Sequence, residues 1–386
     1  MLVRSWRQCR ASSTDSRVRE ANEVSKLLLR IDDQLLHEQD SNIRAELVAQ
    51  QAAYLARIGR FSDARAKIAD LRVVFGDGRS GRVTAFIMLA EGLLLHYEEL
   101  GSGALDRVSR AQLLGSAMKD RAIVGLASAW RAHLEFEASR YDSAVVSLRL
   151  AIENSTDQEH GTRARCAIVL LNVFSLCGDQ LERQRWFVTG RDHAIHEGDQ
   201  ASIDALLHSR AAFGLAWYRA QKCKRELNQT ELFTVRSEVA SARNLQRLTH
   251  MTAHANYIDL CDARLQILEG RYQRAMDLLA QTRITGPFPD GHFSQSLIEL
   301  EIAFCQLRLQ DIEAAVKTFA AIQSTSFSSL DIDDQLVATW MTNELVMADS
   351  RLGLPNEARR KLSEISSEYD KYVSGLRSKF SEFAEQ

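Results

Sequence analysis

Residues that break helices or favour sheets are scarce in this chain. Its 386 residues include only 3 prolines, and aromatic side chains make up 7% of the total. A β-sandwich or barrel needs many tight turns and strands rich in aromatic and β-branched residues, so this composition argues against both. Hydrophobic residues amount to 45%, which is enough to build a core. We therefore expect an all-α protein.

Cysteine pairs are also missing. The chain has six cysteines, and no two of them form a CxxC pair. Neither a zinc site nor a disulfide framework is indicated, so we predict reduced thiols, a cytoplasmic location and no cofactor. The cysteines are Cys9, Cys166, Cys177, Cys223, Cys261 and Cys305.

The chain also lacks an excess of charge of one sign and a long apolar run. The formal net charge is -3, from 48 basic and 51 acidic residues, so no global field attracts nucleic acid or an anionic membrane. The longest apolar stretch, residues 85–95, is interrupted by Glu91 and Gly92, so no membrane span is expected.

Residues 1–17 carry four arginines and one acid. We interpret them as a disordered basic tail, with a transit peptide as the alternative.

What the chain does contain is helical periodicity. Residues 24–35 carry one apolar stripe, and Asp40-Ser41 is a capping signal for the helix that follows. That helix is expected to end at the step Gly59-Arg60-Phe61. After the step, a second stripe begins, made of Ala64, Ile68, Leu71 and Phe75. The pattern predicts a helical hairpin.

The same step recurs along the chain. Residues 139, 178, 270, 310 and 353 begin comparable steps, and neighbouring steps are about 40 residues apart. A weaker step near Gly101 divides the interval between residues 59 and 139. The 92 residues between 178 and 270 fit two units plus about ten extra residues, which we place around residues 222–228. A small residue lets the chain reverse, and the alanine that follows permits close helix approach.

Two of these segments, residues 59–64 and 270–275, resemble the turn between the helices of tetratricopeptide repeats. The resemblance covers residues 40–370 and implies a right-handed α-solenoid of about eight helical hairpins. We expect residues 18–386 to form this single solenoid, with a flexible point at residues 284–293, where proline and glycine cluster.

Apolar residues spaced by threes and fours from Leu362 to Phe383 predict a C-terminal capping helix, with a homodimer through that helix as the alternative.

Motifs for catalysis or cofactor binding are weak. Residues 76–81 have GxGxxG spacing, but the preceding residues continue a helical stripe, so an interhelix loop is expected. His193 with His196, and His250 with His254, could each place two imidazoles on one helix face, but no third ligand follows at helical spacing. Asp333-Asp334 is interpreted as a pair of charges at a helix N-terminus. We predict no catalytic site, no metal and no enzyme activity.

The remaining candidate is the concave face of the repeat stack. In such stacks, this face is lined by first-helix residues thirteen, ten and six positions before the turn. Arginine, asparagine and histidine there suit the backbone or the carboxylate of an extended peptide. At these offsets, the candidate peptide-binding residues are His133, Arg165, Ile168, Asn172 and His208.

The function expected from this architecture is a protein- or peptide-binding scaffold. One alternative is a sensor module that binds a small signal or peptide and relays it to a separate effector. Another is an RNA-binding repeat protein, suggested by the basic stretches at residues 183–185 and 222–225. Those stretches lack interleaved aromatics for base stacking, so we interpret them as solvated faces and expect no nucleic-acid partner.

Overall fold

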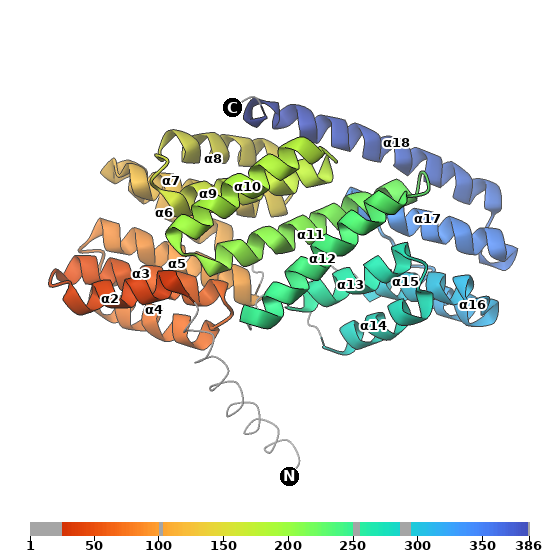
Figure 1. Cartoon of the computed structure of the whole chain (residues 1–386), viewed down its shortest axis with the longest axis horizontal. Helices are drawn as coiled ribbons and strands as arrows, with labels where there is room; N and C mark the ends of the chain where they lie inside the picture. The colour runs from red at the N-terminus through yellow and green to blue at the C-terminus, as the bar shows by residue number, and fades with distance from the viewer. Residues whose placement is uncertain (1–24, 100–102, 250–254, 286–294, 385–386) are drawn as a thin grey trace, which may run out of the picture. The chain divides into compact units, whose positions relative to one another are not determined.

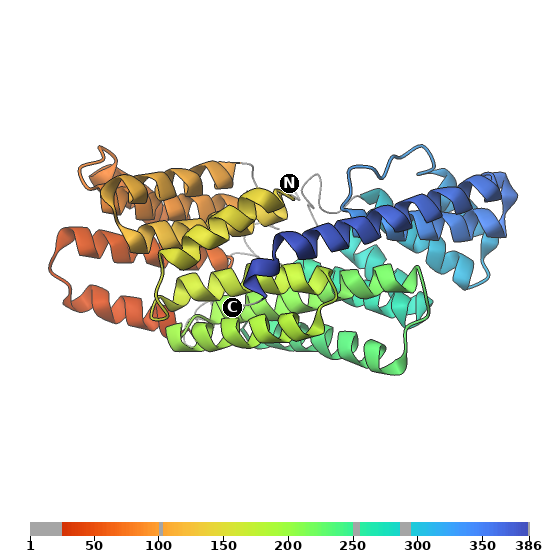
Figure 2. The same ribbon diagram turned by 90° about the horizontal axis from the view of Figure 1, so that it is seen from above.

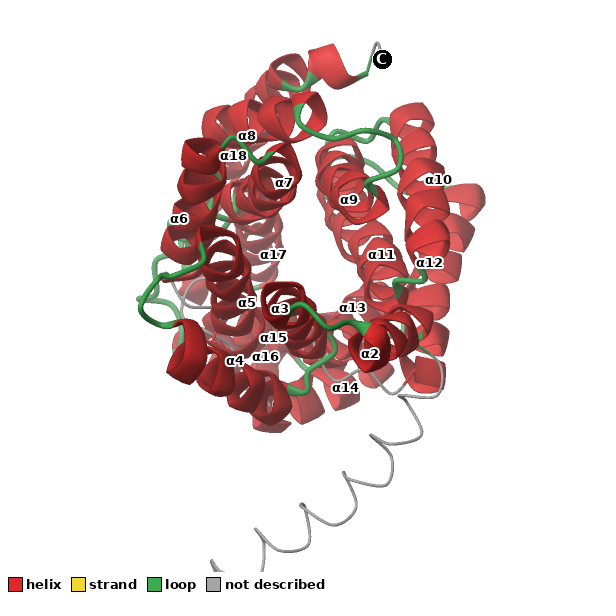
Figure 3. Ribbon diagram, turned by 90° about the vertical axis from the view of Figure 1, so that its left-hand side faces the viewer, coloured by secondary structure: helices red, strands yellow, loops and turns green. Residues whose placement is uncertain are grey.

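The described part of the chain is entirely helical. The computed structural model describes residues 25–99, 103–249, 255–285 and 295–384, and these residues contain α-helices, short 3-10 turns and no strand (Figures 1 and 3). The α-helices are α2 (Lys26–His37), α3 (Ser41–Arg57), α4 (Phe61–Phe75), α5 (Gly81–Glu99), α6 (Gly103–Met118), α7 (Arg121–Glu137), α8 (Tyr141–Glu153), α9 (His160–Leu176), α10 (Gln180–Glu197), α11 (Gln200–Lys222), α12 (Gln229–Thr249), α13 (Ala255–Leu268), α14 (Tyr272–Thr285), α15 (Gln295–Arg308), α16 (Ile312–Ala320), α17 (Ile332–Ala348) and α18 (Pro355–Lys379).

From α3 onward the described helices follow one another as hairpins. Eight pairs run from α3–α4 to α17–α18, which confirms the expected all-α fold and its number of repeats. The cap at the start of α3 is the expected one, because the Asp40 carboxylate accepts hydrogen bonds from the backbone N–H groups of Asn42 and Ile43. Helix α2 precedes the first pair and packs on α3.

Several hairpin turns have a left-handed residue where the sequence pattern placed a step. Gly59 and Gly270 have φ angles of 84° and 74°, and Ser139 and Gln310 also have positive φ angles. After Gly59, the Arg60 N–H donates to the carbonyl of Leu55 at 2.9 Å, a bond that closes the helix end. The second-helix stripes are buried as predicted: Ala64, Ile68, Leu71 and Phe75 in α4, and Ala144, Leu148 and Ala151 in α8.

Two turn glycines, Gly178 and Gly270, differ in the space available to a side chain. Alanine substitutions at the two positions should therefore differ in their cost to stability. Gly178 has a φ angle of +68°, and a Cβ atom there would overlap the Trp217 indole. At Gly270, with a φ angle of +74°, the nearest atom would be the Tyr272 hydroxyl oxygen at 4.0 Å. We expect Gly270→Ala to cost about 1–2 kcal/mol, from the left-handed backbone alone. Gly178→Ala should cost about 1–3 kcal/mol more because the methyl group overpacks against the indole.

Urea unfolding followed by circular dichroism measures both variants. Equal losses in the two would show that the contact with Trp217 relaxes without cost.

The extra residues in the longest interval between steps, residues 178–270, are distributed differently from the sequence prediction. The α11–α12 connection, residues 223–228, is longer than the loop at residues 58–60 and holds part of the extra length. The rest lies in the helices themselves, since α11 has 23 residues and α12 has 21. Placing all the extra residues around 222–228 was therefore wrong, because apolar periodicity continues through both longer helices.

The described residues form two compact units. Unit 1 is formed by the described residues within 1–171, 184–206 and 244–253, and unit 2 by those within 172–183, 207–243 and 254–386. The core of unit 1 is built mainly from α3 to α7, and that of unit 2 from α13 to α17. The single continuous solenoid over residues 18–386 stays a prediction.

The C-terminal helix α18, the second helix of the eighth pair, packs on α17 and reaches α11 within unit 2. Helix α18 lies along α17 (Figure 2), and Tyr369, Leu376, Phe380 and Phe383 are buried within the chain. The Tyr369 cluster also includes Ala220 of α11. This arrangement is that of a capping helix. The homodimer stays a prediction, although the apolar stripe on which it rests is already covered.

Three further sequence predictions can be compared with the structure. Helix α4 continues to Phe75 and α5 begins at Gly81, so the GxGxxG segment links two helices, as expected. No described helix is both long and apolar enough to cross a membrane. The basic tail at residues 1–17, the weak step near Gly101, the pair His250 and His254, and most of the segment 284–293 lie outside the described residues.

Candidate anion-binding site

The structure buries four of the five predicted peptide-binding residues. Arg165, Ile168 and Asn172 on α9 and His133 on α7 are at most 6% exposed, and His208 on α11 is half-buried. The offsets before the turn therefore identified a helix face that other elements cover. Whether any of the five binds a peptide stays a prediction.

Three of the five predicted peptide-binding residues, Ile168, Asn172 and His208, lie apart from the other two. Ile168 packs in a core cluster with Ala164 and Leu171. In unit 2, the His208 ring lies edge-on to Tyr257, and the Oδ1 atom of the buried Asn172 has no hydrogen-bond partner among the described residues. Only Arg165 and His133 are brought together, at a tryptophan that the sequence had not singled out.

That tryptophan is Trp130 on α7, 5% exposed in the core of unit 1. The Arg165 Cζ atom lies 3.6 Å from the centre of its ring, and the Arg57 Cζ atom lies 5.6 Å away. His133 and Tyr97 meet the same indole edge-on, with ring centres 5.8 and 6.3 Å from it. We call these five residues, Arg57, Tyr97, Trp130, His133 and Arg165, the Trp130 cluster.

One of the two arginines in the cluster has a counter-ion. The Arg57 Nη1 atom lies 2.8 Å from Asp199 Oδ2, and its Nη2 atom donates to the Ser202 hydroxyl oxygen at 2.8 Å. Burial works against both charges, but each partner favours the ionised form of the other. The pKa of Asp199 is therefore below its usual value and that of Arg57 above it.

Arg165 is the other arginine, and its charge is not balanced in this way. Its three guanidinium nitrogens meet no acceptor in good hydrogen-bond geometry among the described residues, although the side chain interacts with Tyr97, and it is fully buried. Burial, followed by the positive charge of Arg57, lowers the pKa of Arg165, although Tyr97 and Asp199 act in the opposite direction. A cation–π contact with an indole contributes about 2 kcal/mol when desolvated. That is less than the several kcal/mol needed to bury an ion.

A sequence signal for this burial existed. Every residue of α9 from 164 to 176 is buried, and residues 166–171 are apolar without interruption. A helix that is apolar all round lies inside a protein rather than on its surface. Arg165, next to that run, was therefore a candidate buried charge. Trp130 and Arg57 carry no comparable signal, because their meeting depends on how α3, α7 and α9 pack.

Comparison with known proteins adds one likeness. No protein-family model and no curated protein matches the chain. Among solved structures, it matches one described as the apo form of RapI, with 12% identity and a TM-score of 0.42. The match covers 96% of this chain and 99% of that one. At this level of similarity, the function has to follow from the residues themselves.

The histidine pair singled out on α10 has a third neighbour. The Nδ1 atoms of His160 and His193 are 3.0 Å apart, and the ring of His196 stacks on His160 at 5.1 Å. Burial, followed by the charge of His160, lowers the pKa of His193. Glu197, the neighbouring acid, forms an ion pair with Arg30.

Basic side chains of both stretches pair with acids, but Arg183 of the first is buried whereas Lys224 and Arg225 of the second are exposed, as expected. Arg183 is 2% exposed and forms an ion pair with the buried Glu238, so its interpretation as a solvated residue was wrong. The reason is tertiary: unit 2 supplies a buried acid that the local sequence does not show. In the second stretch, Lys224 and Arg225 contact Asp370 and Glu231.

The acidic pair Asp333-Asp334 lies in the first turn of α17, as expected. Asp334 has a further role, because its Oδ1 atom accepts a hydrogen bond from Arg219 at 2.7 Å. Glu301 Oε1 accepts from Arg219 at 2.5 Å and from Arg264 at 2.9 Å. Two buried cations and two buried acids thus form a balanced network in unit 2.

A pocket of about 360 Å³ lies beside that network. Aromatic residues Tyr272, Phe304 and Trp340 line it, together with Arg219 and other charged side chains. Its cations face acids of the same unit, as in the ion pair between Arg308 and Glu344 at 2.7 Å. The charges that line the pocket are therefore largely matched by acids of unit 2. Arg165 remains the stronger candidate for binding a negative charge.

Proposed function

We propose that this protein is a helical-repeat binding module that takes an acidic group of a peptide or protein partner at Arg165. The observation that carries the proposal is the buried guanidinium that meets no acceptor in good hydrogen-bond geometry among the described residues. A carboxylate would supply both the charge and the acceptors that this group lacks, in the two-pronged geometry that arginine favours.

The rest of the cluster supports the same chemistry. Arg57 is held in place by Asp199 and adds positive potential, while Trp130 offers a flat apolar surface next to the charge. None of the five residues is a serine, threonine or cysteine nucleophile. We therefore propose a binding role and not catalysis. The reducing, cytoplasmic setting expected for the scattered cysteines belongs to the same proposal.

Two peptide pools test the binding role. One pool of random synthetic peptides has free C-terminal carboxylates, and the other has the same sequences amidated at the C-terminus and with Asp and Glu replaced by Asn and Gln. We expect the protein to retain peptides only from the acidic pool. The affinity of a selected peptide, measured by calorimetry, should fall about tenfold to a hundredfold in Arg165→Gln, the effect of losing hydrogen bonds to a charged group.

The matched control is Arg149→Gln, which removes an exposed arginine from α8 of the same unit. It should bind the selected peptide like the wild type. Retention from both pools alike, or equal binding by Arg165→Gln, would refute the proposal. Stabilisation by small dicarboxylates without any peptide binding would favour the sensor alternative.

A further inference from the structure

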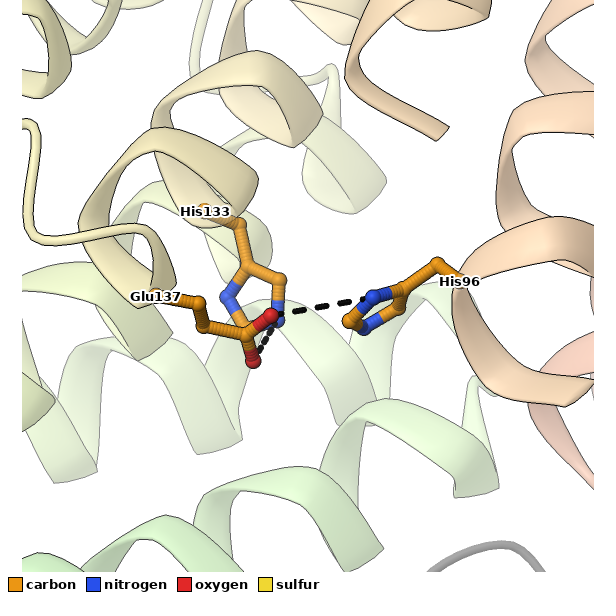
Figure 4. Close-up of side chains that lie close together, drawn as sticks. All are labelled: His96, His133 and Glu137. Atoms are coloured by element: carbon orange, nitrogen blue, oxygen red, sulfur yellow. Dashed lines mark ion pairs between the residues drawn. The ribbon is translucent and has the colours of Figure 1, made fainter. Parts of the chain in front are cut away.

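Two histidines and a glutamate, including His133 of the Trp130 cluster, face one another across two helices. His96 lies in the last turn of α5, and His133 and Glu137 lie four residues apart on α7. Figure 4 shows the three side chains pointing toward a common point. One ligand atom from each lies within 4.8 Å of the others.

The distances between these atoms suit a small divalent cation. His133 Nε2 is 3.1 Å from Glu137 Oε1, and His96 Nδ1 is 3.6 Å from Glu137 Oε2. Ligands held about 2.0–2.2 Å from a tetrahedral zinc ion lie roughly 3.3–3.5 Å from one another. These two separations run to different oxygens of one carboxylate and lie close to that range, and the three ligand atoms lie within 4.8 Å of one another, so side-chain shifts would bring them around one ion.

The surroundings hold two of the ligands firmly and leave the third accessible. His96 and His133 are 5% and 6% exposed, whereas the Glu137 side chain is 34% exposed. Leu93 of α5 and Leu134 of α7 belong to one core cluster, which fixes the two helices behind the histidines. Preorganised imidazoles beside an accessible carboxylate provide rigid ligands and an entry route.

We propose that His96, His133 and Glu137 bind one divalent transition-metal ion of the zinc type. Two imidazoles and one carboxylate are a donor set that such ions accept, with a fourth position left for water or a ligand group. The sequence analysis expected no metal. The i, i+4 spacing of His133 and Glu137 was visible, but the His96 contribution from another helix was not.

The test uses the full-length protein, freed of metal with a chelator and dialysed against Zn²⁺. Elemental analysis should find one zinc per chain, and Co²⁺ in its place should show the visible absorption of a tetrahedral site. Removing a group that merely orients a ligand weakens metal binding by about 10–100-fold. Loss of a ligand in His96→Ala or Glu137→Gln should therefore weaken it by more than about 100-fold.

Glu137→Gln keeps the size of a partly exposed side chain, so its fold should survive even if a histidine variant unfolds. His193→Ala is the matched control, because it removes a histidine from the other histidine group of unit 1 and should leave the stoichiometry at one. Substoichiometric zinc in the wild type, unchanged affinity in Glu137→Gln, or loss of zinc in His193→Ala would each overturn the proposal. Peptide binding at Arg165 is a separate readout, so either proposal can fail alone.

Discussion

The Arg165→Met variant should have a larger free energy of unfolding than the wild type and should no longer bind acidic peptides. Methionine fills the space of the arginine stem but carries no charge, so it removes a buried cation whose nitrogens meet no acceptor in good hydrogen-bond geometry among the described residues. The loss of the contact with Trp130 offsets part of the gain. We expect a net stabilisation of about 1–3 kcal/mol, measured by urea unfolding without ligand.

The matched variant is Arg57→Met, on the other side of the same indole. It leaves the buried Asp199 without its counter-ion, so we expect a loss of about 3–5 kcal/mol. Opposite signs for two chemically identical substitutions would identify Arg165 as a residue kept for binding rather than for stability. A loss of stability in both would mean that Arg165 already has an adequate partner in the folded protein.

Glu301→Gln should be among the most destabilising single substitutions in unit 2. The Glu301 side chain is fully buried, and its Oε1 atom accepts hydrogen bonds from both Arg219 and Arg264. Glutamine keeps the shape and one acceptor but removes the charge, which leaves Asp334 as the remaining acid of the network. Breaking such a network costs about 3–5 kcal/mol, to be measured by urea unfolding.

Its control is Glu313→Gln, which removes an equally charged acid whose side chain is 83% exposed and pairs with Arg351 at 3.3 Å. That pair is screened by water, so we expect no measurable change. If Glu301→Gln were equally silent, the network would be held by packing and not by charge.

The two clusters of buried charge explain why only one is proposed as a binding site. In unit 2, Arg219 and Arg264 meet Glu301 and Asp334, so each buried cation has acids of the same unit beside it. In the Trp130 cluster, Asp199 serves Arg57, and Arg165 has no such acid. An incomplete buried network is costly to maintain and is typical of a site completed by a ligand.

Local sequence determined the helices and their turns with good accuracy. The stripe from Ala64 to Phe75 and the cap at Asp40 are where the pattern placed them, because both depend on residues within one or two helical turns. The step at Gly270 is correct for the same reason, since its left-handed backbone is a property of that residue. These features require no knowledge of distant contacts.

The candidate sites were only partly visible. The offset rule selected Arg165 and His133 from two different repeats, and the structure does place both against Trp130. The rule also selected Ile168, which lies in the core. The offset rule is wrong for Ile168 because a sequence offset specifies only which face of a helix a residue lies on. Whether that face is exposed to solvent depends on the neighbouring helices.

By itself, the sequence determined that this chain is a series of about eight helical hairpins, because periodicity, capping and turn residues act over a few residues at a time. Only the tertiary structure decided which charges are balanced. Arg57 finds Asp199 across 142 positions, and His96 meets Glu137 across two helices, while Arg165 finds no acid of its own. Electrostatic and coordination partners depend on distance in space, and helix packing sets that distance.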